Sequence, residues 1–117
     1  MNLILRFFLE LAALAGIGVA TFQVSEGVLA YLFTPIAVLI AATIWGVFNV
    51  PGDPSRSGHA PVAISGVARL ILELIILFGG SFAFYLAGYV WIGLSHAGLT
   101  VLHYTLSGQR LRWLLKQ

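Results

Sequence analysis

The chain has 117 residues, of which 60% are apolar and 9% are charged, and its formal net charge is +2. A soluble domain carries about 25% charged residues, so this composition indicates a protein whose solvent is lipid. The small net charge argues against a nucleic-acid surface. The absence of cysteine excludes disulfides, thiolate metal sites and thiol nucleophiles.

Four apolar runs predict four membrane-spanning helices within a single domain, residues 1–117. The runs cover residues 3–22, 28–50, 64–87 and 89–106, and each is close to the ~20 residues with which a helix crosses a bilayer core. The first run is expected to be retained and not cleaved as a signal peptide, because Glu10 interrupts it. Ser65 is the expected N-cap of the third span.

The polar segments separate these runs and follow the last one. Residues 51–63 form a loop, since three prolines and two glycines in this stretch cannot sustain a helix. The basic tail, residues 107–117, either extends the last helix or lies on the membrane surface with Trp113 as an anchor. The expected fold is therefore an all-α bundle of four transmembrane helices.

A short pattern of charged and apolar residues occurs at the start of the first span and again in the third. Arg-x-x-Leu-Glu-Leu begins at Arg6 and at Arg69, and seven of the fifteen positions from Arg6 to Ala20 are identical in the second copy. We therefore expect two helix hairpins that form parallel pseudo-repeats. Small residues recur every four positions in the spans, and this spacing predicts close helix packing and is compatible with a homodimer. The sets are Ala12/Gly16/Ala20, Ala42/Gly46, Gly79/Ala83/Ala87 and Gly93/Ala97.

The basic residues predict the orientation of the chain in the membrane. With the N-terminus inside, all six lie at the cytoplasmic end, and the outer turns hold only the acidic Glu26. Both termini are therefore expected in the cytoplasm. The six basic residues are Arg6, Arg56, Arg69, Arg110, Arg112 and Lys116.

The repeated charges predict a polar centre in the cytoplasmic leaflet. A spacing of four places Arg6 with Glu10, and Arg69 with Glu73, on one face of each helix. Arginine before glutamate is the less favourable order for a local pair. We therefore expect a cross arrangement, in which Arg6 meets Glu73 and Arg69 meets Glu10. Charges inside a membrane are functional candidates, and a structural ionic clasp is the competing interpretation.

Three further residues lie at a similar depth. Trp45 and Asn49 end the second span, where Trp45 is an expected membrane anchor and Asn49 either bonds a glutamate or caps helix carbonyls. His103 lies toward the cytoplasmic end of the fourth span. Glu10, Glu73 and His103 provide metal-ligand side chains, but no E-x-x-H motif accompanies them. We expect no metal, no cofactor and no catalytic residues.

These motifs also resemble a known family. Leu5-Arg6-Phe7-Phe8-Leu9-Glu10-Leu11, Pro35 followed by Trp45-Gly46-x-Phe48-x-x-Pro51, and Leu72-Glu73-Leu74 occur in this order. In this respect the chain resembles the YrdB-like family of small bacterial integral membrane proteins, whose function is unknown. The resemblance implies four spans in the bacterial inner membrane and supplies no activity.

Three functional interpretations remain open. The leading one is a non-enzymatic bundle whose ionic centre supports a binding cleft or assembly with a membrane partner. The second is a small proton- or cation-coupled transporter, which is similar in size to the small multidrug resistance family. The third is a membrane enzyme or a haem or metal protein that uses Glu10, Glu73 and His103. The expected partners are the lipid bilayer, a second copy of the chain or a larger membrane assembly, and not nucleic acid.

Overall fold

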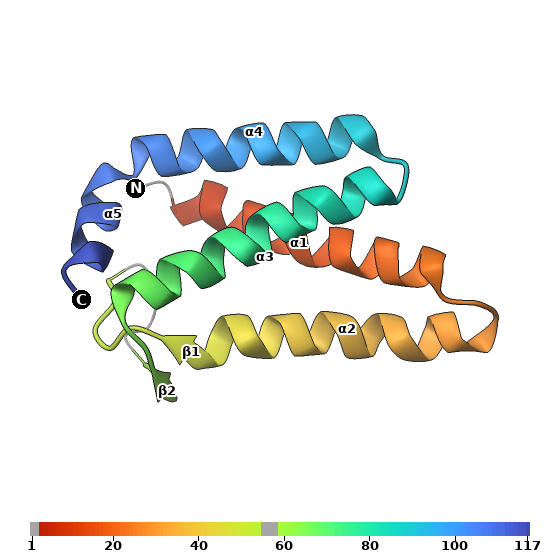
Figure 1. Cartoon of the computed structure of the whole chain (residues 1–117), viewed down its shortest axis with the longest axis horizontal. Helices are drawn as coiled ribbons and strands as arrows, with labels where there is room; N and C mark the ends of the chain where they lie inside the picture. The colour runs from red at the N-terminus through yellow and green to blue at the C-terminus, as the bar shows by residue number, and fades with distance from the viewer. Residues whose placement is uncertain (1–2, 55–58) are drawn as a thin grey trace.

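The computed structural model describes residues 3–54 and 59–117, and most of this part of the chain is helical (Figure 1). Arg56, one of the six basic residues used to predict the orientation, lies outside the described residues. The elements in chain order are α1 (Leu3–Val24), α2 (Val28–Val47), β1 (Phe48–Asn49), β2 (Val62–Ala63), α3 (Gly66–Leu86), α4 (Val90–Leu106) and α5 (Gly108–Leu115).

Three of the helices are long and apolar enough to cross a membrane. They are α1, α2 and α3, with 22, 20 and 21 residues and mean hydropathies of 2.0, 2.1 and 2.0. The fourth expected span, α4, has 17 residues. The all-helical prediction is thus confirmed, together with three candidate spans.

The helices form a flat arrangement in which α1 and α3 occupy the centre. α2 packs mainly against α1, and α4 packs mainly against α3. The molecule measures 46 × 30 × 20 Å, so it is thin in one direction. Because each outer helix packs mainly against one neighbour, most of its apolar side chains face outward. Leu39 of α2 and Leu94 of α4, for example, are 64% and 54% exposed.

The central contact depends on glycine. A Cβ atom added to Gly80 of α3 would lie 2.4 Å from the Ala13 Cα of α1, and one added to Gly16 would lie 2.7 Å from the Gly80 carbonyl oxygen. Gly93 of α4 lies equally close to the Ser81 carbonyl. Close packing at Gly16 and Gly93 is therefore confirmed. The expectation for Gly79 is wrong, because a Cβ there would meet nothing within 4 Å.

Local sequence explains where the long helices begin and end. Ser65 accepts a hydrogen bond from the Ala68 amide at 3.2 Å, so the predicted N-cap of α3 is confirmed. Gly27 and Gly88, in the two turns at the far end of the molecule, have positive φ angles of 57° and 92°. Glycine adopts this conformation without a steric penalty.

The connection between α2 and α3 contains a short parallel strand pairing that the sequence did not predict. Phe48 pairs with Val62, and Asn49 pairs with Ala63. The expected second span reached residue 50, whereas α2 ends at Val47. The pairing brings the two ends of the connection together, which fixes the end of α2 beside the start of α3.

The basic tail forms a separate helix, α5, and does not extend α4. It turns across the end of the molecule where α1 begins (Figure 1), and it packs against α3. Leu114 of α5 is completely buried. A Cβ atom added to Gly66 would lie 1.6 Å from the Leu114 carbonyl oxygen, so only glycine lets α5 approach the start of α3 this closely.

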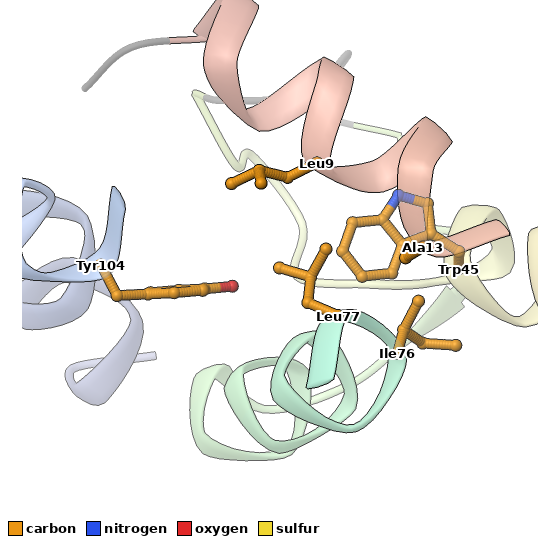
Figure 2. Close-up of a cluster of buried hydrophobic side chains, with 6 residues drawn as sticks. All are labelled: Leu9, Ala13, Trp45, Ile76, Leu77 and Tyr104. Carbon is orange, nitrogen blue, oxygen red and sulfur yellow. The ribbon is translucent and has the colours of Figure 1, made fainter. Parts of the chain in front are cut away.

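Figure 2 shows the apolar core between α1, α3 and the ends of α2 and α4. Leu77 and Ala13 are completely buried in it. Trp45 is also part of this cluster and is 7% exposed. The expectation that Trp45 anchors the chain at the membrane surface is therefore wrong, because its ring packs inside the protein. The cluster consists of Leu9, Ala13, Trp45, Ile76, Leu77 and Tyr104.

Candidate functional site

Glu73 is the centre of a buried group of charged side chains. It is completely buried in α3, and its Oε1 atom accepts hydrogen bonds from three arginines. These are Arg6 at 2.5 Å, Arg69 at 3.2 Å, and Arg110. The hydroxyl of Tyr104 donates to Oε2 at 2.8 Å. Four helices, α1, α3, α4 and α5, thus contribute a donor to one carboxylate.

Arg6 links α1 to this centre. Its Nε donates to Glu10 Oε1 at 2.9 Å, and its Nη2 donates to Glu73. The structure thus contains the Arg6–Glu73 half of the predicted cross arrangement. It also contains both local pairs, since Arg69 Nε bonds Glu73 one turn along α3. The Glu10 side chain is 19% exposed and lies at the margin of the group.

Arg69 joins the end of α2 to the same centre. Its Nη1 donates to the carbonyl oxygens of Trp45 at 2.8 Å and Phe48 at 2.7 Å. Carbonyls at a helix C-terminus lack partners within the helix and carry partial negative charge, so a guanidinium is well suited to them. Arg69 also lies over the Trp45 ring, 4.5 Å from its centroid, where a cation–π interaction is favourable.

Asn49 is buried near this end of α2. Its side-chain amide donates to the Gly46 carbonyl at 2.6 Å and to the His59 carbonyl at 3.3 Å. Of the two roles considered for Asn49, these contacts correspond to the capping of a helix carbonyl. Asn49 therefore holds the α2–α3 connection against the end of α2.

His103 lies beside the site in α4. It is 2% exposed, and its ring meets the Tyr104 ring edge-on with centroids 5.4 Å apart. Among residues 3–54 and 59–117, no three histidine, aspartate or glutamate side chains are grouped closely enough to hold a metal ion. Glu10, Glu73 and His103 are accordingly not brought together there as a set of three ligands.

Sequence reasoning missed three members of the site: Arg110, Asp53 and Tyr104. Arg110 of α5 is 7% exposed, and its Nη1 donates to both carboxylate oxygens of Asp53, at 2.8 and 2.9 Å. Asp53 follows the end of α2 and is 1% exposed. Asp53 is one of only four acidic residues in the chain, and this scarcity was the signal that could have identified it.

We call six of these side chains the ion-pair cluster: Arg6, Glu10, Asp53, Arg69, Glu73 and Arg110. Three are cationic and three are anionic, so the formal charges of the cluster sum to zero. Buried charges are tolerated only when they are paired and hydrogen-bonded. Three of the four acidic residues of the whole chain are used here, which explains how so apolar a protein accommodates them.

A second polar contact lies farther along the helices. His96 of α4 is buried, with its Nδ1 atom 2.5 Å from Ser81 Oγ and its Nε2 atom 2.9 Å from the Leu9 carbonyl oxygen. Because a carbonyl only accepts, Nε2 carries a proton. This contact joins α1, α3 and α4 and is the hydrogen-bonded arrangement typical of bundle histidines.

A cleft of about 650 Å³ lies beside the ion-pair cluster, and we call it the α5 cleft. It opens between the start of α1, the end of α4 and one side of α5. Its walls include the apolar side chains of Leu3, Leu106 and Trp113 and the polar side chains of Ser107, Gln109 and Arg110. Arg110 therefore belongs both to the cluster and to the cleft.

These features define an all-helical protein with three helices long and apolar enough to cross a membrane and a buried ion-pair cluster at one end. Residues 4–101 match the model of the protein family of unknown function DUF2568. The chain therefore belongs to this family. It is also 43% identical to the uncharacterized protein YrdB of Bacillus subtilis (strain 168), over 99% of this chain and 94% of the relative. No solved structure matches the chain.

The family match and the site overlap only in part. The matched residues include Arg6, Glu10, Asp53, Arg69 and Glu73, and they end before Tyr104 and α5. The alignment with the Bacillus protein extends over nearly the whole chain. The family carries no assigned activity, so the function of the site has to be argued from its geometry.

Proposed function

We propose that the chain is a four-span protein of the bacterial cytoplasmic membrane with both termini in the cytoplasm. α4 has 17 residues, and at 1.5 Å per residue it reaches about 25 Å, which is within the range of short spans. The start of α1 and the C-terminus lie at the same end of the molecule (Figure 1). Arg6, Arg69 and Arg110 gather there, as the positive-inside rule requires of a cytoplasmic end.

The two hairpins, α1–α2 and α3–α4, are in this proposal pseudo-repeats that have diverged in role. Their local arginine–glutamate pairs, Arg6–Glu10 and Arg69–Glu73, are both formed. Glu73 has become the common acceptor of the cluster, whereas Glu10 remains at its margin. This asymmetry supports a repeat whose second copy carries the central contact.

The cluster itself acts as a structural clasp and not as a catalytic centre. One observation carries this proposal: Glu73 is completely buried and already accepts four hydrogen bonds. A carboxylate offers about four lone-pair positions, and four donors already surround this one, three at Oε1 and one at Oε2. A substrate, a metal ion or a transported cation would have to displace an arginine or Tyr104 to reach it.

The clasp serves a binding function by holding the α5 cleft in shape. Arg110 fixes α5 to Glu73 and Asp53, and the position of α5 forms one wall of the cleft. The protein is thus a non-enzymatic bundle whose ionic centre supports a binding cleft at the cytoplasmic end, open to a ligand or a membrane partner.

The topology is tested by cysteine labelling. Because the chain contains no cysteine, single variants report one position each. A membrane-impermeant maleimide is added to cells that carry Glu26→Cys, Tyr89→Cys or Gln117→Cys. The cell envelope outside the cytoplasmic membrane is permeabilised beforehand, so that the reagent reaches the outer face of that membrane. We expect labelling at positions 26 and 89 and protection at 117 until the cytoplasmic membrane is permeabilised. Labelling at 117 together with 26 and 89 would mean that α4 does not cross the membrane.

The clasp is distinguished from a transporter by flux measurements. We expect vesicles that contain the purified protein to show no cation uptake driven by a pH gradient beyond that of protein-free vesicles. Glu10→Gln is the matched variant, because Glu10 is the partly exposed carboxylate of the cluster. Uptake by the wild-type protein that Glu10→Gln abolishes while the variant remains folded would contradict the proposal.

A further inference from the structure

Arg110, one of the residues that line the α5 cleft, carries an unused hydrogen-bond donor. Arg110 is 7% exposed, and its Nη atoms donate to Asp53 and Glu73. Its buried Nε atom has no hydrogen-bond partner among residues 3–54 and 59–117. A buried donor without a partner costs about 1–3 kcal/mol. An acceptor supplied from the cleft that Arg110 lines would remove this cost.

The start of α5 adds further donors to the same wall. The first amide groups of a helix point outward without partners in the helix, and they favour anions. Ser107 stands at the N-cap of α5 but makes no side-chain capping bond. Its hydroxyl donates instead to the His103 carbonyl at 2.6 Å. Ser107, Gln109 and Arg110 all line the cleft, so the uncapped first turn of α5 borders it.

The charge near the cleft is also suitable for an anion. The ion-pair cluster is formally neutral, so it supplies no net charge of its own. Arg112 of α5 and Lys116 just beyond it are exposed, and residues 107–117 contain no acidic side chain. Basic residues at a membrane surface attract anionic lipids by about 1 kcal/mol each.

The apolar walls indicate that the anion carries hydrocarbon. Leu3 and Leu106 are 52% and 71% exposed and stand at the ends of α1 and α4, where acyl chains would lie. Trp113 completes the wall from α5, and tryptophan is favoured at the level of the lipid headgroups. The cleft thus combines donors at one side with apolar surface at the other.

We propose that the α5 cleft binds the phosphate group of an anionic amphiphile, with the phosphate against Arg110 Nε and the first turn of α5. This assignment rests on the proposed function, in which the cleft lies at the cytoplasmic surface of the membrane. A phospholipid headgroup and a soluble phosphate ester share this chemistry. The hydrocarbon chains of a phospholipid would lie along Leu3 and Leu106.

Thermal unfolding of the full chain in detergent tests the site. Short-chain phosphatidylglycerol, phosphatidylcholine of the same chain length and inorganic phosphate are added separately. A ligand that binds only the folded state raises the unfolding temperature. We expect phosphatidylglycerol to raise it in a saturable way and to bind about tenfold more tightly than phosphatidylcholine, since only the former carries a net negative charge. Equal shifts with the two lipids would overturn the proposal.

Two charge variants locate the binding. Gln109→Glu places a negative charge in the cleft, where it repels a phosphate, and it preserves the fold because glutamate is favoured in the first turn of a helix. Gln117→Glu makes the same change at an exposed residue outside the cleft. We expect roughly tenfold weaker phosphatidylglycerol binding in Gln109→Glu, from like-charge repulsion, and unchanged binding in Gln117→Glu. Equal weakening in both would overturn the assignment to this cleft.

The measurement with inorganic phosphate distinguishes a lipid ligand from a soluble one. The choice of detergent solution separates the binding proposal from the proposed topology. A shift with inorganic phosphate that matches the one with phosphatidylglycerol, and that Gln109→Glu removes, supports the site and makes a soluble phosphate compound its ligand. The detergent measurement does not depend on orientation in the membrane. Failure of the cleft to bind therefore differs from failure of the proposed topology, which the cysteine labelling detects separately.

Discussion

Glu73 illustrates what a single buried residue requires in an apolar protein. A carboxylate away from water must find both countercharges and hydrogen-bond donors within the protein. Glu73 obtains them from Arg6, Arg69, Arg110 and Tyr104. Each of these contacts comes from a different helix, so the requirement of one residue determines how four helices meet.

Neutralising Glu73 is expected to destabilise the protein strongly. Glu73→Gln leaves three arginines facing two carboxylates, and breaking a buried ion pair costs about 3–5 kcal/mol. The measurement is the unfolding temperature of the purified protein in detergent. Glu26→Gln removes the one acidic residue outside the ion-pair cluster, which is exposed, and should leave the unfolding temperature unchanged. A Glu73→Gln variant as stable as Glu26→Gln would rule out the clasp.

The contact between α1 and α3 shows how precisely two elements are matched. The sequence repeat aligns Gly16 with Gly79, but in the structure Gly16 lies against Gly80. Adjacent residues of an α-helix point about 100° apart. A shift of one residue therefore decides which glycine faces α1 and which faces outward.

Neighbouring glycine variants test this contact. Gly80→Ala places a Cβ atom 2.4 Å from the Ala13 Cα, and overpacking of this kind costs about 1–3 kcal/mol. Gly79→Ala meets nothing within 4 Å and should be neutral or stabilising, since alanine favours a helix over glycine by about 1 kcal/mol. Unfolding temperatures in the same detergent compare the two. A reversed order would contradict the described packing of α1 on α3.

At the scale of the whole molecule, the flat arrangement leaves a large apolar surface. Phe82, Leu86 and Trp91 are 60%, 65% and 80% exposed. A soluble protein rarely tolerates contiguous apolar patches of this kind, whereas lipid accepts them. Stability then comes from close packing and polar contacts inside the molecule, because lipid gives no hydrophobic drive for helices to associate.

Paired truncations on α3 test this inside–outside difference. Leu77 is completely buried, and Leu77→Ala is expected to cost about 2–5 kcal/mol because it creates a cavity. Ile75 on the same helix is 63% exposed, and Ile75→Ala should cost under ~1 kcal/mol, since lipid or detergent fills the space it leaves. The two unfolding temperatures are measured in one detergent. Equal losses would mean that the outward face of α3 is packed against protein.

The sequence by itself determined the class of protein. Long apolar runs require helices wherever lipid replaces water, because every backbone amide must be bonded within its own segment. The same runs made Arg6, Glu10, Arg69 and Glu73 conspicuous, since charges are costly there. Helix periodicity also placed each arginine on the same face as its glutamate.

Only the tertiary structure decided how these charges are combined. Arg110 and Asp53 lie in the tail and in the α2–α3 connection, where no periodic pattern predicts a burial site, and they are 57 residues apart in sequence. They enter the ion-pair cluster because α5 packs against the start of α3 at Gly66. Long-range electrostatic contacts depend on where chain segments meet, and a one-dimensional pattern of residues does not contain that information. The α5 cleft likewise depends on where α5 lies in the folded chain, which the residue pattern does not contain.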